Sequence, residues 1–213
     1  MKRKGDTIMV SKLEKRILDI SYKYGLSHIG SCLTVVRMLD IVYQTRGPED
    51  PVILSNGHAG LALYVILEKY YGHDAEELWK KHGTHPNRDP KHHIYCSTGS
   101  LGQGVPIGVG MALADRTRDV YIVTSDGELA EGSCWEALRV AGDLRLENLR
   151  VFVNANGYSA YKKLEEDILD VRLQYFYPTL VHKTNLFNFP DYLQGLGGHY
   201  HVLTKEEHAR FNG

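Results

Sequence analysis

Two short polar segments, each placed at the end of an apolar run, contain the residue types best suited to chemistry. Ser125-Asp126-Gly127 follows the run at 120–124, and Asn154-Ala155-Asn156 ends the run that begins at 149. A helical segment separates the runs, so a right-handed βαβ unit would bring both polar segments to one edge of a parallel sheet. Asp126 and Asn156 would present a carboxylate and an amide oxygen there. Such ligands suit Mg²⁺, which keeps phosphate oxygens and water in the rest of its octahedron.

Gly127 makes the same edge suitable for a diphosphate. It has no side chain where an anion could approach the backbone, and the helix that follows would aim its free N–H groups at that anion. The chain has no GxxxxGK[ST] sequence, and Gly102-Gln103-Gly104 lacks the third glycine of GxGxxG, so the two common phosphate loops are excluded. An Asp-Gly pair after a strand is also ordinary turn chemistry, which stays the alternative.

The elements that would position these residues alternate along the chain. Apolar spacing predicts helices over about 10–24, 34–43, 59–70 and 105–114, and Val52-Ile53-Leu54 reads as a short buried strand. The pattern predicts an α/β fold, a doubly wound and mostly parallel sheet with helices on both faces, in a single domain over 1–213. Beyond residue 161 the pattern weakens. We expect a last strand at 199–203 and a short helix opened by the capping box of Thr204 and Glu207.

Composition narrows the class of protein. The 213 residues are 43% hydrophobic, and 25 basic against 26 acidic side chains give a net charge of −1, which favours neither nucleic acid nor an anionic membrane as partner. No apolar stretch reaches the roughly 20 residues needed to span a bilayer, so we expect a cytoplasmic protein. Cys32, Cys96 and Cys134 are too far apart for a disulfide framework. The spacing of His92, His93 and Cys96 matches no standard structural zinc site.

Further motifs, in a fixed order, resemble those of the transketolase family. Asn156 follows Asp126 by 30 residues, which resembles the thiamine diphosphate motif. The closest likeness is to the amino-terminal, diphosphate-binding subunit of split transketolases; it is strongest over residues 10–160 and weak over 162–213. The other matching segments are Ser27-His28-Ile29-Gly30-Ser31, residues 53–59, His85-Pro86, residues 97–104 and residues 126–132.

The resemblance implies a cofactor and a set of ligands. Thiamine diphosphate would bind with Mg²⁺, or with Ca²⁺ in its place, and Asp126, Asn156 and the backbone carbonyl of Tyr158 would hold the metal. The residues that would contact the cofactor itself are His58 and Gly127 at the diphosphate, Gly99 and Leu101 along the rings, and Asn156.

The resemblance also implies the reaction. A two-carbon ketol unit would pass between sugars, and His28 and His85 would act as catalytic groups facing the substrate, because each step moves a proton on or off a sugar oxygen. Glu131 and Glu136 match positions that line an acidic channel for a proton relay across the family's dimer interface. The alternative explanation is that carboxylates near the start of a helix interact favourably with the helix dipole.

The same likeness implies that this chain needs a partner. The glutamate that activates the cofactor belongs to a separate pyrimidine-binding domain, so we expect no activity without that subunit, in a homodimer or heterotetramer. Two alternatives stay open: a degenerate, non-catalytic binding subunit, and another thiamine diphosphate enzyme such as a relative of deoxyxylulose-phosphate synthase. The first is motivated by Ser125 in place of the motif's first glycine, by Ala155, and by the absence of the family's later diphosphate-contacting histidine.

Overall fold

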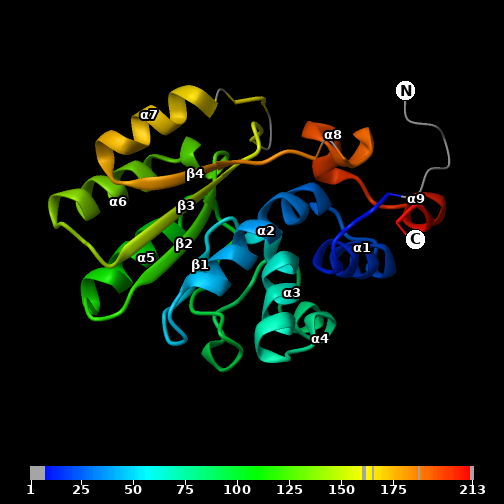
Figure 1. Cartoon of the computed structure of the whole chain (residues 1–213), viewed down its shortest axis with the longest axis horizontal. Helices are drawn as coiled ribbons and strands as arrows, with labels where there is room; N and C mark the ends of the chain where they lie inside the picture. Colours follow the sequence, from blue (N-terminus) through cyan, green and yellow to red (C-terminus); the bar gives the residue numbers. More distant parts are fainter. Residues whose placement is uncertain (1–7, 160–161, 165, 187, 212–213) are drawn as a thin grey trace.

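Four parallel strands form the centre of the structure, a computed structural model that describes residues 8–159, 162–164, 166–186 and 188–211. The strands are β1 (Val52–Leu54), β2 (Val120–Ser125), β3 (Leu149–Ala155) and β4 (Thr179–Lys183), and they lie in sequence order across the sheet. All three neighbouring pairs are parallel (Figure 1). The predicted α/β fold with a parallel sheet is therefore confirmed. The ends of the predicted domain, 1–7 and 212–213, lie outside the described residues.

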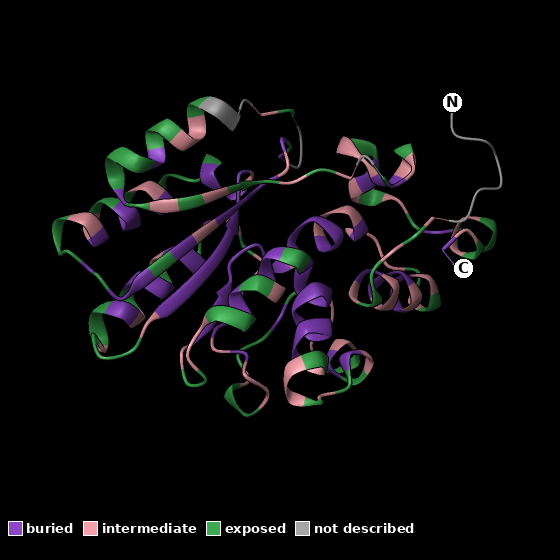
Figure 2. Cartoon of the chain, in the orientation of Figure 1, coloured by how far each residue is buried: buried purple, intermediate pink, exposed green. Residues whose placement is uncertain are grey.

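Side chains that alternate along the strands build two separate cores. Leu54 and Val123 belong to the cluster that contains the helices between residues 12 and 82, whereas Ile53 and Ile122 belong to the cluster that contains the helices between residues 104 and 176. Successive residues of a strand point to opposite faces, so a sheet covered on both faces must be apolar at every position. All nine residues of β1 and β2 are accordingly buried (Figure 2). This explains why both strands read as continuous apolar runs.

The helices of the first face are α1 (Lys12–Tyr24), α2 (Ile29–Thr45), α3 (Gly60–Tyr71) and α4 (Ala75–His82). A capping box of Ser11 and Glu14 opens α1, and Gly25 in the left-handed conformation ends it. In α3 the first eight residues are all buried, because this helix lies between the sheet and its neighbours. The predicted helices at 10–24 and 59–70 are confirmed, and α2 begins five residues before its predicted start.

The second face is covered by α5 (Gly104–Ala114), α6 (Gly132–Asp143) and α7 (Glu166–Phe176). The side chain of Asn148 donates to the carbonyls of Ala112, Asp115 and Arg118, which fixes the end of α5 against the start of β3. Short 3₁₀ turns follow the first two strands, η1 (Gly57–Ala59) after β1 and η3 (Glu128–Ala130) after β2. Both turns stand at the carboxyl edge of the sheet.

The carboxyl-terminal part differs from the sequence prediction. β4 is the last strand, and the chain continues through η4 (Asp191–Leu193) and α8 (Gly195–Tyr200) to α9 (Lys205–Ala209), which returns beside α1 (Figure 1). The strand predicted at 199–203 is wrong: β4 already occupies the place beside β3, and His199 lies in α8. The predicted capping box of Thr204 and Glu207 opens α9, as expected. No described helix is long and apolar enough to cross a membrane.

Candidate functional site

β2 and β3 bring Asp126 and Asn156 to the same edge of the sheet. Ser125 pairs with Asn154 in the strand register, and the Asp126 amide donates to the Asn154 carbonyl over 3.2 Å. The Asp126 side chain is 2% exposed and its two oxygens accept different amides, from Gly127 at 2.9 Å and from Gly157 at 2.7 Å. One buried carboxylate thus joins the loop after β2 to the loop after β3.

Asn156 organises the neighbouring backbone. Its Oδ1 accepts the amide of Tyr158 over 3.0 Å, a turn that sets the direction of the following peptide. A Cβ on Gly127 would lie 3.4 Å from the Tyr158 carbonyl oxygen and 3.3 Å from the Cα of Ser159. The absence of a side chain at 127 therefore lets the loop after β2 pack closely against the loop after β3. Ser125 has no positive φ, so its Cβ strains no backbone there.

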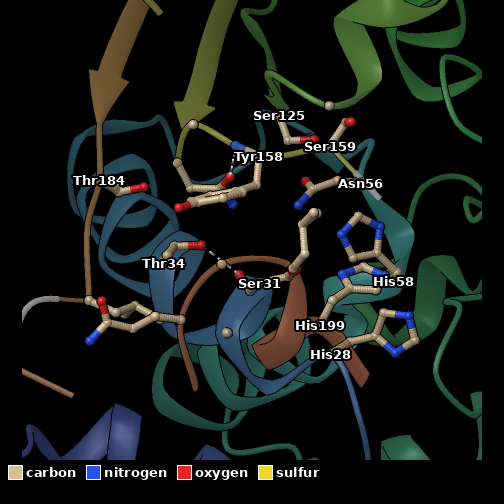
Figure 3. Close-up of a pocket in the computed structure, with 18 of the residues that line it drawn as sticks. His28, Ser31, Thr34, Asn56, His58, Ser125, Tyr158, Ser159, Thr184 and His199 are labelled. Atoms are coloured by element: carbon tan, nitrogen blue, oxygen red, sulfur yellow. Dashed lines mark hydrogen bonds between the residues drawn. The ribbon is translucent and has the colours of Figure 1, made fainter. Parts of the chain in front are cut away.

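A cavity of about 540 Å³ opens at this edge. Figure 3 shows side chains from α2, the β1 turn, the loop after β3 and α8 around it. Asp126 lies just behind the wall, between Ser125 and Gly127, which line the cavity. The other predicted site residues that line it are His28, His58, His85, Gly99, Leu101, Asn156 and Tyr158.

Three histidine rings meet on one side of the cavity. The centroid of the His28 ring lies 4.4 Å from that of His199 and 5.7 Å from that of His58 (Figure 3). His28 stands at the start of α2 with φ 63°, a left-handed conformation that is costly for a side chain other than glycine and that occurs often at functional sites. The Nδ1 of His28 shares a hydrogen bond of 2.8 Å with the hydroxyl of Ser27.

Burial keeps these rings neutral. Desolvation, followed by the charges of neighbouring histidines, lowers the pKa of His58 to about 3 and that of His28 to about 4. Desolvation also lowers the pKa of His199. A neutral imidazole can accept one hydrogen bond and donate another at a substrate oxygen, and an arriving anion would favour the protonated form, which can donate a proton.

Sequence analysis did not single out His199. The resemblance led us to expect no counterpart of the family's later diphosphate-contacting histidine; in the structure His199 follows β4, lines the cavity and contacts the His28 ring. The His28 amide also donates to the His199 carbonyl over 2.9 Å, so the two residues are held together through the backbone. Little in the sequence signals this contact, because 171 residues separate the two positions and α8 is short.

The loop from Gly99 to Gly104 approaches the cavity through close backbone contacts. A Cβ on Gly57 would lie 2.6 Å from the Gly99 nitrogen, and a Cβ on Gly99 would lie 2.8 Å from the His85 ring. Both glycines therefore permit a packing that any side chain would prevent. This packing sets His85 and Leu101 at the cavity wall.

The cavity wall fits an anionic, partly apolar cofactor. The amide group of Asn56 lines the cavity, and neither its nitrogen nor its oxygen has a hydrogen-bond partner within the described part of the chain. Lys163 and Lys183 contribute positive charge, and leucines line other parts of the wall. Thr34, Asn154 and Thr184 form a hydrogen-bonded chain beside it, with donor–acceptor distances of 3.0 and 2.6 Å. Carboxylate, amide and carbonyl oxygens beside a polar wall are a donor set suited to Mg²⁺ and a diphosphate.

Other predicted positions lie outside the cavity. Glu131 precedes α6 and Glu136 lies within it; both are exposed and neither lines the cavity. His92 bonds Asp89, and the ring of His93 stacks on Tyr71 at 3.6 Å. In the described ranges no three His, Cys, Asp or Glu side chains are grouped so that they could hold a metal ion.

Comparison with known proteins identifies the family of this site. The family model described as "Transketolase, thiamine diphosphate binding domain" matches residues 9–175. The chain belongs to the transketolase family. A 6-deoxy-6-sulfo-D-fructose transketolase subunit from Clostridium sp. is 33% identical over 164 residues, 68% of this chain and 60% of that protein. One of the subunits of an apulose-4-phosphate transketolase from Phocaeicola vulgatus is 32% identical over 165 residues, 68% of this chain and 58% of that protein.

Two further comparisons give the extent of the likeness. A 1-deoxy-D-xylulose-5-phosphate synthase from Fusobacterium nucleatum is 29% identical over 153 residues, 70% of this chain and 25% of that protein. Transketolase from Leishmania mexicana superimposes with a TM-score of 0.75 at 22% identity, over 93% of this chain and 39% of that one, which shows a shared fold. This transketolase-family chain spans about 60% of the length of the curated subunits it matches.

Proposed function

We propose that this chain is the diphosphate-binding half of a two-chain, transketolase-like enzyme that transfers a two-carbon ketol unit between sugars. The observation that carries the proposal is the convergence of Asn156 and three histidines on one cavity at the carboxyl edge of the sheet, with Asp126 buried directly behind its wall. These five residues come from five separate segments of the chain. Ligands of open α/β sheets bind at this edge. Over the described residues the chain forms one α/β body around this site, and we propose that it acts as a single domain.

We assign the cofactor ligands as follows. Asp126, Asn156 and the Tyr158 carbonyl would hold Mg²⁺, and Gly127 would leave room for the diphosphate. His58, and His199 with it, would contact the diphosphate oxygens. Thiamine diphosphate, when bound, supplies a nucleophilic carbon that makes and breaks bonds beside a sugar carbonyl.

The catalytic work of this chain would be proton transfer and positioning. His28 and His85 line the cavity, and we assign them to move protons at the sugar oxygens. The His28 ring is neutral in this structure, so its unprotonated nitrogen is available to accept a proton. Gly99 and Leu101 would lie along the rings of the cofactor and keep water from them.

In this proposal a second polypeptide completes the active site. We propose a separate pyrimidine-binding subunit, and a dimer or heterotetramer whose interface includes Glu131 and Glu136, which are exposed at the start of α6. The relatives that are named as transketolase subunits support this division into two chains.

The metal assignment can be tested by calorimetry. Thiamine diphosphate should be titrated, with and without Mg²⁺, into the chain together with its partner subunit. Asp126→Ala should weaken metal-dependent binding by about a hundredfold or more, since even outer partners of a metal site are worth about 10–100-fold. The matched control is Asp143→Ala, because Asp143 is exposed and pairs with Arg139 on the surface of α6. Equal affinity of wild type and the Asp126 variant would refute the metal assignment.

A second candidate function uses the same cofactor site for a different reaction. The similarity to a 1-deoxy-D-xylulose-5-phosphate synthase favours condensation of pyruvate with an aldehyde as the alternative. The assembled enzyme should be offered ketose donors and, separately, pyruvate. Turnover of ketoses alone supports ketol transfer, and turnover of pyruvate alone supports the alternative.

A further inference from the structure

Glu128 is a buried carboxyl group that lies two residues after Asp126 in the η3 turn. Its side chain is fully buried, at 0% exposure. It accepts three hydrogen bonds: from the hydroxyl of Ser55 at 3.0 Å, from the amide of Gly102 at 3.0 Å, and from the hydroxyl of Thr124 at 2.7 Å. Desolvation raises the pKa of Glu128, and these hydrogen bonds oppose that shift. The carboxyl group is therefore costly to bury and is stabilised by neutral donors.

The three donors come from three different parts of the site. Ser55 follows β1, Thr124 lies in β2, and Gly102 lies in the loop whose Gly99 and Leu101 line the cavity. A single carboxylate thus joins the ends of two strands to the loop between Gly99 and Gly104. An apolar side chain of the same size would fill the space without this cost of burial. The hydrogen bonds, rather than space filling, explain a glutamate here.

Gly102 is held from both sides. Its amide donates to Glu128, and its carbonyl accepts the Ser133 hydroxyl over 2.9 Å. Its φ is +76°, and a Cβ there would lie 2.6 Å from the Cβ of Glu131. Both polar backbone groups of Gly102 are consequently bound by the segment that directly follows the Asp126 loop.

We propose that Glu128 is a positioning residue that clamps Gly102, and through it sets Gly99 and Leu101 at the cavity wall in register with the Asp126 loop. The proposal rests on the proposed function, since it gives Glu128 a part in cofactor binding. Glu128 itself does not line the cavity and acts through the loop.

Hydrogen exchange of the chain without cofactor tests the clamp directly. In Glu128→Ala the amides of residues 101–103 should exchange about 10–100-fold faster, the equivalent of losing a hydrogen bond to a charged group. Glu128→Gln keeps one side-chain oxygen for Ser55 and Gly102, and should restore slow exchange. Ser133→Ala removes the second bond to Gly102 at an exposed position, so it keeps the fold and should show a smaller increase.

The role of Glu128 in cofactor binding needs a second measurement. It is the affinity for thiamine diphosphate in the presence of Mg²⁺, measured on the complex with the partner subunit. Glu128→Ala should bind about tenfold or more weakly, with Glu128→Gln near wild type. Glu14→Gln is the matched control: Glu14 is also buried, at 1% exposure, but it caps α1 and pairs with Arg37. It should lower stability and leave both readouts unchanged.

The outcomes separate this inference from the proposed function. Slow exchange at residues 101–103 in Glu128→Ala would overturn the clamp, whatever the affinity. Fast exchange with unchanged affinity would overturn its role in binding. A wild-type complex that binds no thiamine diphosphate would overturn the proposed function and the binding role together, while the exchange result would still decide whether the clamp exists.

Discussion

At the scale of single residues, the site combines buried polar groups whose partners come from distant parts of the chain. Asp126 bonds the amide of Gly157, and Asn154 bonds Thr34, 120 residues earlier. Each such group is stable only while its partner is in place, because a buried unsatisfied polar group costs about 1–3 kcal/mol. The site is therefore preorganised by the fold, and the neutral histidines are its most pH-sensitive part.

The histidines predict a dependence of stability on pH. The pKa of His58 falls from 6.5 to about 3 on folding, so the unfolded chain binds a proton that the folded chain refuses. Stability from this group is fully present above pH 6.5 and is lost as pH falls from 6.5 towards 3, by up to about 1.4 kcal/mol per unit. After desolvation, the charges of His28, His199 and His85 lower the pKa of the same ring further.

Urea unfolding midpoints between pH 4.5 and 7.5 measure this dependence. His58→Gln should flatten the decline below pH 6.5, since glutamine does not titrate. His182→Gln is the control, because His182 is exposed on β4. A variant at His58 with the wild-type slope would show that this ring is protonated in the folded chain.

At the scale of elements, the carboxyl ends of β1, β2 and β3 are followed by turns that need glycine for different reasons. Gly57 allows the close approach of the Gly99 loop, and Gly127 leaves space beside the Tyr158 carbonyl. By contrast, Gly110 lies within α5 and a Cβ there would meet no atom within 4 Å. Glycine in a helix interior lowers stability, so these positions should respond in opposite directions to the same substitution.

This difference can be tested by comparing the stability of two variants, Gly57→Ala and Gly110→Ala. The first places a Cβ 2.6 Å from backbone atoms and should destabilise the chain by about 1–3 kcal/mol and weaken cofactor binding. The second should stabilise it by about 1 kcal/mol through helix propensity and leave cofactor binding unchanged. Denaturant unfolding and cofactor titration provide the readouts. A neutral Gly57→Ala would mean that the Gly99 loop can move away without cost.

At the scale of the whole molecule, α5 presents an exposed apolar face. α5 has no charged residue along its eleven positions, and Ile107 and Leu113 on its outer side are 39% and 45% exposed. The exposed Glu131 and Glu136 lie on the neighbouring helix α6 and the turn before it. An apolar helix face bordered by carboxylates suits burial in an assembly.

Assembly provides a prediction at this scale. The chain alone should show no ketol transfer, and addition of the pyrimidine-binding subunit should produce it. Ile107→Glu should weaken the assembly seen by light scattering about tenfold or more, because it buries a charge in the interface. Ile168→Glu is the matched control, since Ile168 is also 48% exposed but lies on α7. Equal loss in both variants would place the interface elsewhere.

The sequence by itself determined the first three strands, β1, β2 and β3, their polar ends and most of the helices on the first face. The apolar runs that end at Asp126 and Asn156 could be predicted as strands for two reasons. Their residues prefer the strand conformation, and a parallel sheet that is covered on both faces requires apolar side chains at every position. The turn at Gly127 and the capping box at Thr204 could also be predicted, because turns and helix caps depend on residues that are neighbours in the sequence.

Only the tertiary structure decided which distant groups meet. The place of His199 against His28, the edge position of β4 and the three donors to Glu128 depend on contacts between residues far apart in the sequence. The residues 199–203 have a strand-like composition, but β4 pairs with β3 at the edge of the described sheet, and His199 lies in α8 at the cavity instead. Such contacts are set by the packing of whole elements, and local sequence preferences do not encode them.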